Sequence, residues 1–127
     1  MNEVRVLIVD DSSVMRKIVE RSLRQAGLDP LVVFEAGSGT DGIAVLKAQM
    51  VHLILSDINM PSMDGLEFLR QIRAQKLATG VPVVMITTES SEEHVKQAIL
   101  SGAQGYIRKP FTSEQVKERV LPLLSAA

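Results

Sequence analysis

The stretch Val6-Leu7-Ile8-Val9-Asp10-Asp11 decides the fold, because an unbroken apolar run leads directly into two carboxylates. A continuous apolar run of this length is typical of a strand that is buried on both faces, as in a parallel sheet. The same pattern recurs at Leu53-Ile54-Leu55-Ser56-Asp57, and Val83-Val84-Met85-Ile86 leads into Thr87. Each of these strands is therefore expected to end on a polar side chain, and the polar ends need an explanation.

Segments with helical spacing separate the apolar runs, so strands and helices alternate along the whole chain. The expected strands are Arg5–Val9, Leu31–Glu35, Leu53–Asp57, Val83–Ile86 and Gly105–Arg108. Helices are expected from about Ser13 to Ala26, Ser38 to Met50, Asp64 to Lys76, Ser90 to Ser101, and from Thr112 onward. This alternation predicts right-handed crossovers and one parallel sheet with helices on both faces.

The expected helices carry start signals, stop signals and apolar faces. Capping residues begin four of them, namely Ser38, Asp64, Ser90 and Thr112, and Gly27 ends the first helix. The apolar face of the first helix is expected to consist of Val14, Ile18, Val19 and Leu23, and that of the second of Ile43, Val45, Leu46 and Met50. Pro122 lies late in the last helix, where a kink or fraying is expected.

Size and composition bound the class of protein. A chain of 127 residues, 46% of them hydrophobic, suits one domain with a real core. Its 14 basic and 15 acidic residues give a formal net charge of -1, without the concentrated basic face that nucleic-acid binding needs. There is no cysteine, so disulfides and thiolate metal sites are excluded. We find neither a signal peptide nor an apolar run long enough to cross a bilayer, so a cytoplasmic protein without membrane insertion is expected.

The polar strand ends are expected to meet, because parallel strands place their C-terminal ends at one edge of the sheet, where open α/β sheets bind ligands. Asp10, Asp11 and Asp57 would then share one crevice with Thr87 and with Lys109, which follows the last strand. Three carboxylates in one place are costly unless a cation is present, and ligands that are all oxygens point to a hard ion such as Mg²⁺. Alternatively, Asp10 and Asp11 merely cap the first helix, but that leaves Asp57 unexplained.

The charges of this crevice suit phosphoryl transfer. The three aspartates contribute -3, and Mg²⁺ with Lys109 contributes +3, so the resting site is neutral. Asp57 lies on a different strand from the acidic pair and could attack a phosphoryl group to form an aspartyl phosphate. Lys109 would pair with Asp57 at rest and with phosphate oxygens afterwards, and the bond to Pro110 could be cis or trans. Thr87 is either a hydrogen-bond donor to phosphate or an ordinary β-branched strand residue.

The combined motifs resemble the receiver domains of two-component response regulators, most closely the chemotaxis type that consists of a receiver alone. The motifs are Val9-Asp10-Asp11-Ser12, Asp57-Ile58-Asn59-Met60-Pro61 followed by Asp64-Gly65, and Lys109-Pro110-Phe111. The likeness covers essentially the whole chain and implies a flavodoxin-like, doubly wound (βα)5 fold with strand order 2-1-3-4-5. It also implies a single receiver domain over residues 1–127 without an output domain, and we expect a monomer.

The resemblance implies a role for each matching residue. Asp57 is the phosphoacceptor, and Lys109 contacts the phosphoryl group. Thr87 is the switch hydroxyl, and Tyr106 is the switch aromatic. Mg²⁺ is held by the side chains of Asp10, Asp11 and Asp57 and by the backbone carbonyl of Asn59. Two positions tune the lifetime of the phosphoryl group, namely Asn59 and Glu89.

The implied activity is that of a signalling switch, and not of an enzyme beyond its own phosphorylation and dephosphorylation. A histidine kinase of the CheA type or a phosphotransfer protein would donate the phosphoryl group. Thr87 would then move inward, and Tyr106 would turn from exposed to buried. The surface formed by the helix Ser91–Ser101, the fifth strand and the last helix would change and would regulate a downstream protein, such as a flagellar motor switch protein.

Three other functions are open at the level of sequence. A phosphatase of the haloacid-dehalogenase type also forms an aspartyl phosphate, but it usually needs a second acid where this chain has Asn59. An FMN-binding flavodoxin-like module needs a phosphate loop of Ser, Thr or Gly after the first strand, where this chain has two carboxylates. An interaction scaffold that is never phosphorylated would not need the intact site.

Overall fold

A parallel sheet forms the centre of the protein, and its five strands follow the order β2-β1-β3-β4-β5. The computed structural model describes residues 3–88 and 92–125. The strands are β1 (Val4–Val9), β2 (Leu31–Ala36), β3 (Leu53–Asp57), β4 (Val83–Thr87) and β5 (Gly105–Arg108). The predicted strand order and the parallel pairing are therefore confirmed.

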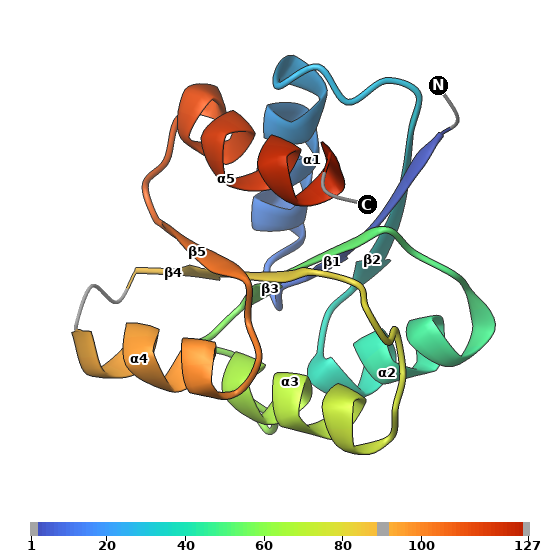
Figure 1. Cartoon of the computed structure of the whole chain (residues 1–127), viewed down its shortest axis with the longest axis vertical. Coiled ribbons are helices and arrows are strands. Elements are labelled where there is room, and N and C mark those ends of the chain that lie inside the picture. The colour runs from blue at the N-terminus through green and yellow to red at the C-terminus, as the bar shows by residue number, and fades with distance from the viewer. Residues whose placement is uncertain (1–2, 89–91, 126–127) are drawn as a thin grey trace.

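Helices cover both faces of this sheet (Figure 1). α1 (Ser13–Gln25) and α5 (Ser113–Ser125) lie on one face, while α2 (Gly39–Ala48), α3 (Gly65–Ala74) and α4 (Glu92–Leu100) lie on the other. This is the doubly wound α/β arrangement that the alternation of strands and helices predicts. Within residues 3–88 and 92–125, none of the helices has the length and apolar character needed to cross a bilayer.

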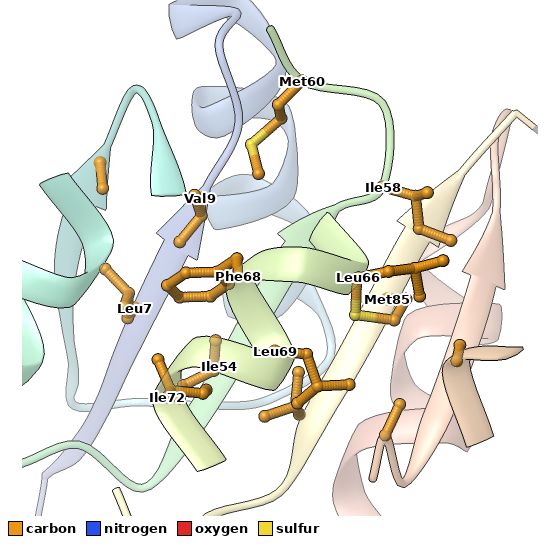
Figure 2. Close-up of a cluster of buried hydrophobic side chains, with 14 of the residues drawn as sticks. Leu7, Val9, Ile54, Ile58, Met60, Leu66, Phe68, Leu69, Ile72 and Met85 are labelled. Atoms are coloured by element: carbon orange, nitrogen blue, oxygen red, sulfur yellow. The ribbon is translucent and has the colours of Figure 1, made fainter. Parts of the chain in front are cut away.

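The core has two layers, because successive side chains of a strand point to opposite faces of the sheet. In β1, Leu7 and Val9 belong to the cluster beneath α2, α3 and α4, while Val6 and Ile8 belong to the cluster beneath α1 and α5. Phe68 of α3 is fully buried and points toward Leu7 and Val9 (Figure 2). Burying each such side chain contributes roughly 1.5–3 kcal/mol, so the apolar strands hold the sheet edge on which the polar residues lie.

Two apolar residues of α1 do not face the core, contrary to the expectation from the sequence. Val14 is 67% exposed and Ile18 is 40% exposed, whereas Val19 and Leu23 are buried. The buried stripe consists of Val19, Ser22 and Leu23, which have the i, i+3, i+4 spacing of one helical face. Val14 and Ile18 lie beside this stripe, so the predicted apolar face was too wide.

The expectation for Met50 was also wrong. α2 ends at Ala48, and Met50 is 63% exposed in the connection to β3. The helix ends there because Gln49 adopts an extended backbone conformation, with φ -131° and ψ 143°. Leu46 is buried, and the remaining predicted face residues of this helix pack against the core as expected.

The predicted capping residues begin the helices wherever the structure describes them. Ser38 and Asp64 each accept a hydrogen bond from the backbone N–H three residues further on. Thr112 and Gln115 form a reciprocal capping box at the start of α5. The predicted cap at Ser90 lies outside the described residues.

The helix ends differ from the prediction by one or two residues. α1 ends at Gln25, and Gly27 follows with a φ of 100°, a conformation that suits glycine at a helix end. α3 ends at Ala74, two residues before the predicted end. α5 contains Pro122, where a kink or fraying was expected, and the helix continues beyond it to Ser125.

Candidate metal centre and phosphoacceptor site

Three carboxylates meet at the C-terminal edge of the sheet. β1 and β3 are adjacent and parallel, with Val9 paired to Ser56, so Asp10 and Asp57 follow at neighbouring positions. Asp10, Asp11 and Asp57 each offer one carboxylate oxygen, and these oxygens lie within 4.8 Å of one another. Asp10 and Asp57 are buried, at 4% and 7% exposure, while Asp11 is exposed. The fold thus brings together the three aspartates that the sequence singled out.

Hydrogen bonds hold Asp10 through both its backbone and its side chain. Its N–H donates to Ala36 O at 3.0 Å, and its Oδ1 accepts from Ser12 N at 2.9 Å. Its carbonyl oxygen accepts from Arg16 Nη1 at 2.6 Å. The N-cap of α1 is Ser12, whose side chain accepts a backbone hydrogen bond from the first turn of that helix. The alternative that Asp10 and Asp11 are merely helix caps is therefore wrong.

Lys109 joins the two buried aspartates. Its Nζ lies 3.3 Å from Asp10 Oδ2 and 3.5 Å from Asp57 Oδ2, and its side chain is 15% exposed. Its backbone N–H donates to Thr87 O at 2.7 Å, which ties the connection after β5 to the end of β4. The Lys109–Pro110 peptide bond, whose isomer the sequence left open, is cis. One ammonium against three carboxylates leaves a formal charge of -2, which a divalent cation would neutralise.

Burial raises the pKa of Asp57 above the ordinary range of an aspartate. The Lys109 ammonium opposes this shift, and the neighbouring Asp10 carboxylate adds to it. The backbone N–H of Asn59 donates to Asp57 Oδ1 at 3.3 Å and also favours the charged form. The charge of Asp57 is therefore incompletely compensated by the protein, and the all-oxygen donor set of the cluster fits a hard cation such as Mg²⁺.

Thr87 and Tyr106 lie on the same face of the sheet. The register pairs Met85 with Tyr106 and Thr87 with Arg108, and alternate residues of a strand share a face. Thr87 is 1% exposed, whereas Tyr106 is half-buried and packs against the cluster beneath α2, α3 and α4. A surface hollow of about 380 Å³ begins at Tyr106 and continues along β5 and α5. The two predicted switch residues are therefore diagonal neighbours on adjacent strands.

Asn59 and Glu89 are the two positions predicted to tune the lifetime of the phosphoryl group. Asn59 is exposed and lies two residues after Asp57, to which its backbone N–H is bonded. Glu89 lies outside the described residues. The tuning role of both side chains stays a prediction.

An apolar hollow beside the acidic cluster was missed from the sequence. It has a volume of about 370 Å³ and is lined by Met15, Ile18, Thr88, Lys109, Pro110 and Phe111. Ile18, which the sequence assigned to the core, forms part of this wall instead. The only signal in the sequence was that Ile18 lies beside the regular i, i+3, i+4 stripe of α1. The edge of the sheet that carries the acidic cluster is thus flanked by apolar surface on the α1 side.

Gly65 belongs to a motif quoted from the sequence, but nothing in the sequence indicated a structural reason for a glycine there. It is the first residue of α3, and its N–H donates to Ile58 O at 2.7 Å. A Cβ at this position would overlap the backbone of Asp57 and Ile58. The absence of a side chain therefore lets α3 begin directly against the end of β3.

Comparison with known proteins defines the class. Residues 6–121 match the family model described as the response regulator receiver domain. The chain therefore belongs to the response regulator receiver domain family. A receiver domain is a signalling domain rather than a catalytic enzyme, as the resemblance of the motifs implied.

The most informative relatives are chemotaxis proteins. A chemotaxis protein CheY homolog of Campylobacter jejuni is 38% identical over 122 residues, which cover 95% of this chain and 92% of that protein. The structure of the Vibrio cholerae chemotaxis protein CheY4 matches with a TM-score of 0.87 at 34% identity, covering 97% of this chain and 100% of that one. A CheY-like receiver domain protein from Methanospirillum hungatei matches with a TM-score of 0.85 at 30% identity, covering 98% and 96%. The CheY-like character and the flavodoxin-like fold predicted from the sequence are confirmed.

Proposed function

We propose that this chain is the phosphorylation-activated switch of a two-component system, with Asp57 as the phosphoacceptor. The proposal is carried by one observation: a buried carboxylate contacts a lysine inside a cluster of three acidic side chains. Chemistry at phosphorus needs positioning and neutralisation of charge, and these groups supply both. The rival phosphatase would use an acid where Asn59 stands, and an FMN-binding module would not place carboxylates after its first strand.

In the proposed step, a carboxylate oxygen of Asp57 attacks the phosphorus of a phosphohistidine on a histidine kinase or a phosphotransfer protein. An O–P bond forms while the N–P bond breaks, and the imidazole leaves with the electron pair. Lys109 exchanges part of its contact with Asp57 for contact with phosphoryl oxygens. Mg²⁺, when bound, neutralises developing negative charge. The residues that would hold it are the side chains of Asp10, Asp11 and Asp57 and the backbone carbonyl of Asn59.

Incubation with acetyl phosphate tests this function. In the presence of Mg²⁺ the wild-type protein should gain the mass of one phosphoryl group, and a chelator should prevent the gain. Intact-protein mass spectrometry measures the incorporation, and hydroxylamine should remove the group because it cleaves acyl phosphates. Sustained release of phosphate from small esters without this gain in mass would contradict the proposal and support the phosphatase.

The proposed switch couples Asp57 to Tyr106 through Thr87. Phosphorylation takes Asp57 from one negative charge to about two and adds acceptor oxygens. The Thr87 hydroxyl would move toward a new oxygen, and Tyr106, on the same face, would turn into the space that Thr87 leaves. Driving such an equilibrium from mostly inactive to mostly active needs about 5 kcal/mol, which a few charge-assisted hydrogen bonds of about 1.5–3 kcal/mol each can supply.

Thr87→Ala should accept the phosphoryl group yet leave Tyr106 in its resting environment. Tyr106 is the single tyrosine and the chain has no tryptophan, so intrinsic fluorescence reports on this residue alone. Acrylamide should quench this fluorescence less after phosphorylation of the wild type, because a buried ring is shielded, and equally before and after in Thr87→Ala. Thr87→Ser keeps the hydroxyl and is the matched control, which should retain most of the response. A wild-type response in Thr87→Ala would contradict the coupling.

The likeness to chemotaxis proteins supports a proposal for the partners. Because the similar proteins from C. jejuni and V. cholerae are chemotaxis proteins, we propose that this chain also works in chemotaxis. A CheA-like kinase would then be the donor, and a flagellar motor switch protein would be the target. The target would bind the surface of α4, β5 and α5, which includes the hollow beside Tyr106.

A further inference from the structure

We propose that Arg16 is a positioning residue of the metal centre, which fixes the Asp10–Asp11 backbone and is itself held by Glu35. The inference rests on the proposed function, because it concerns the same Mg²⁺ site. Arg16 Nη1 donates to Asp10 O at 2.6 Å, and Arg16 Nε donates to Glu35 Oε1 at 2.9 Å. One guanidinium therefore links the connection between β1 and α1 to the end of β2.

The carbonyl that Arg16 holds belongs to the peptide unit joining Asp10 to Asp11. This unit is planar, so a hydrogen bond to its carbonyl fixes the orientation of the unit and the direction in which the chain enters Asp11. The first hydrogen bond of α1 runs from Arg16 N to Ser12 O at 3.1 Å, so the Asp10 carbonyl lies before the helix and outside its ladder. Asp11 is exposed, so packing does little to orient it. Together with the hydrogen bonds of Asp10 to Ala36 and Ser12, the Arg16 contact therefore sets the backbone from which the Asp11 carboxylate reaches the cluster.

A second ion pair holds Glu35 and, through it, Arg16. Lys17 Nζ donates to the other oxygen of Glu35 at 2.7 Å, and the Arg16 and Glu35 side chains are only 17% and 27% exposed. The charge of Glu35 also offsets that of Arg16, so the guanidinium repels a cation in the cluster less than an unpaired one would. Lysine at position 16 could not replace Arg16, because one ammonium cannot reproduce the two contacts of a rigid planar fork.

Titration of Mg²⁺ alone into unphosphorylated protein tests the inference without any turnover. Isothermal titration calorimetry should give a Kd for Arg16→Met that is roughly tenfold weaker than for wild type, a typical loss when a contact supporting a metal ligand is removed. Arg16→Lys should be weakened to a similar degree. Arg24→Met is the matched control, because Arg24 lies on the same helix and pairs with Glu20. Its Kd should equal that of the wild type.

Two further measurements separate positioning from a simple loss of stability. Metal-free thermal melts define the temperature below which each variant is folded, and the titrations are done there. Glu35→Gln should weaken Mg²⁺ binding in the same direction as Arg16→Met. Combining the two substitutions should weaken binding little beyond Arg16→Met alone, because both act through one contact. If Arg16→Met does not fold, the test is the comparison of the Mg²⁺ Kd of Glu35→Gln with that of Arg24→Met.

The possible results distinguish this inference from the proposed function. A wild-type Kd in folded Arg16→Met, in a protein that binds Mg²⁺ and is phosphorylated, overturns the inference alone. If the losses of Mg²⁺ affinity in Arg16→Met and Glu35→Gln add fully in the double variant, Glu35 does not act through Arg16, and that part of the inference is overturned. Failure of the wild type to bind Mg²⁺ at all would overturn the inference and the proposed function together.

Discussion

Asp57→Asn should lose all phosphoryl incorporation from acetyl phosphate. An amide lacks the anionic oxygen that attacks phosphorus, and the substitution also removes one charge from the acidic cluster and one partner of Lys109. Intact-protein mass spectrometry in the presence of Mg²⁺ should show no phosphoryl mass, where the wild type shows one. Asp41→Asn is the matched control, because it makes the same chemical change at an exposed position of α2, and it should behave as wild type. Incorporation into Asp57→Asn at the wild-type level would place the acceptor elsewhere.

The same substitution should raise the thermal midpoint of the metal-free protein. Burial raises the pKa of Asp57, so the folded protein binds this proton more tightly than the unfolded chain does. Stability is therefore lost as the pH rises from the unfolded to the folded pKa of Asp57, and the loss is complete above the folded pKa. Asparagine carries no charge and avoids the loss, so we expect a higher thermal midpoint for Asp57→Asn than for the wild type.

Thermal melts with a chelator over a series of pH values check this gain. The difference between Asp57→Asn and wild type should be largest near neutral pH and should disappear in acid, where Asp57 is protonated in both folded and unfolded protein. A gain in stability also proves that the variant is folded when it fails to accept phosphate. A midpoint below that of the wild type at neutral pH would mean that the Asp57 charge is already compensated by the protein.

Gly65→Ala should destabilise the fold by about 3 kcal/mol, although it adds only one methyl group. The new Cβ would lie 2.8 Å from Ile58 Cα and 2.7 Å from Met85 Cε, and it would overlap the carbonyl oxygen of Asp57. Backbone atoms cannot swing aside as the end of a flexible side chain can, so the start of α3 must move away from β3. For a domain of this size the thermal midpoint should fall by on the order of 10 °C.

Gly105→Ala is the matched control for this prediction. A Cβ at Gly105 in β5 would meet no atom within 4 Å, so the substitution should change stability by about 1 kcal/mol or less. Urea or thermal unfolding of both variants gives the comparison. If Gly65→Ala unfolded at the same midpoint as Gly105→Ala, the close approach of α3 to the acceptor strand would not be a constraint.

The fold and the acidic cluster could be predicted because both depend on patterns that are local in sequence. Apolar runs such as Val6–Val9 are long enough to be strands buried on both faces, and their parallel arrangement brings Asp10, Asp57 and Lys109 to one edge of the sheet. The capping residues are likewise read from short motifs, and Asp64 begins α3 as predicted. The switch roles of Thr87 and Tyr106 came from the family resemblance, although the position of Thr87 at a strand end already suggested a hydrogen-bond donor to phosphate.

The remaining features depend on contacts between segments that are distant in sequence. Nothing near Arg16 shows that its side chain reaches back to Asp10 and across to Glu35 on β2. Nothing near Gly65 shows that the backbone of the acceptor strand occupies the space of its missing side chain. Periodicity placed Ile18 on the apolar face of α1, but the position of the neighbouring elements decides which part of that face is buried.

Residues of β1 alternate between the cluster beneath α1 and α5 and the cluster beneath α2, α3 and α4. The reactive groups lie at the strand ends and in the connections that follow them, so the scaffold and the chemistry are carried by different residues. Exposed positions of α4 and α5 can therefore be exchanged without disturbing the acidic cluster. Substitutions confined to the outward sides of α4 and α5 could therefore direct the proposed switch to a different partner protein.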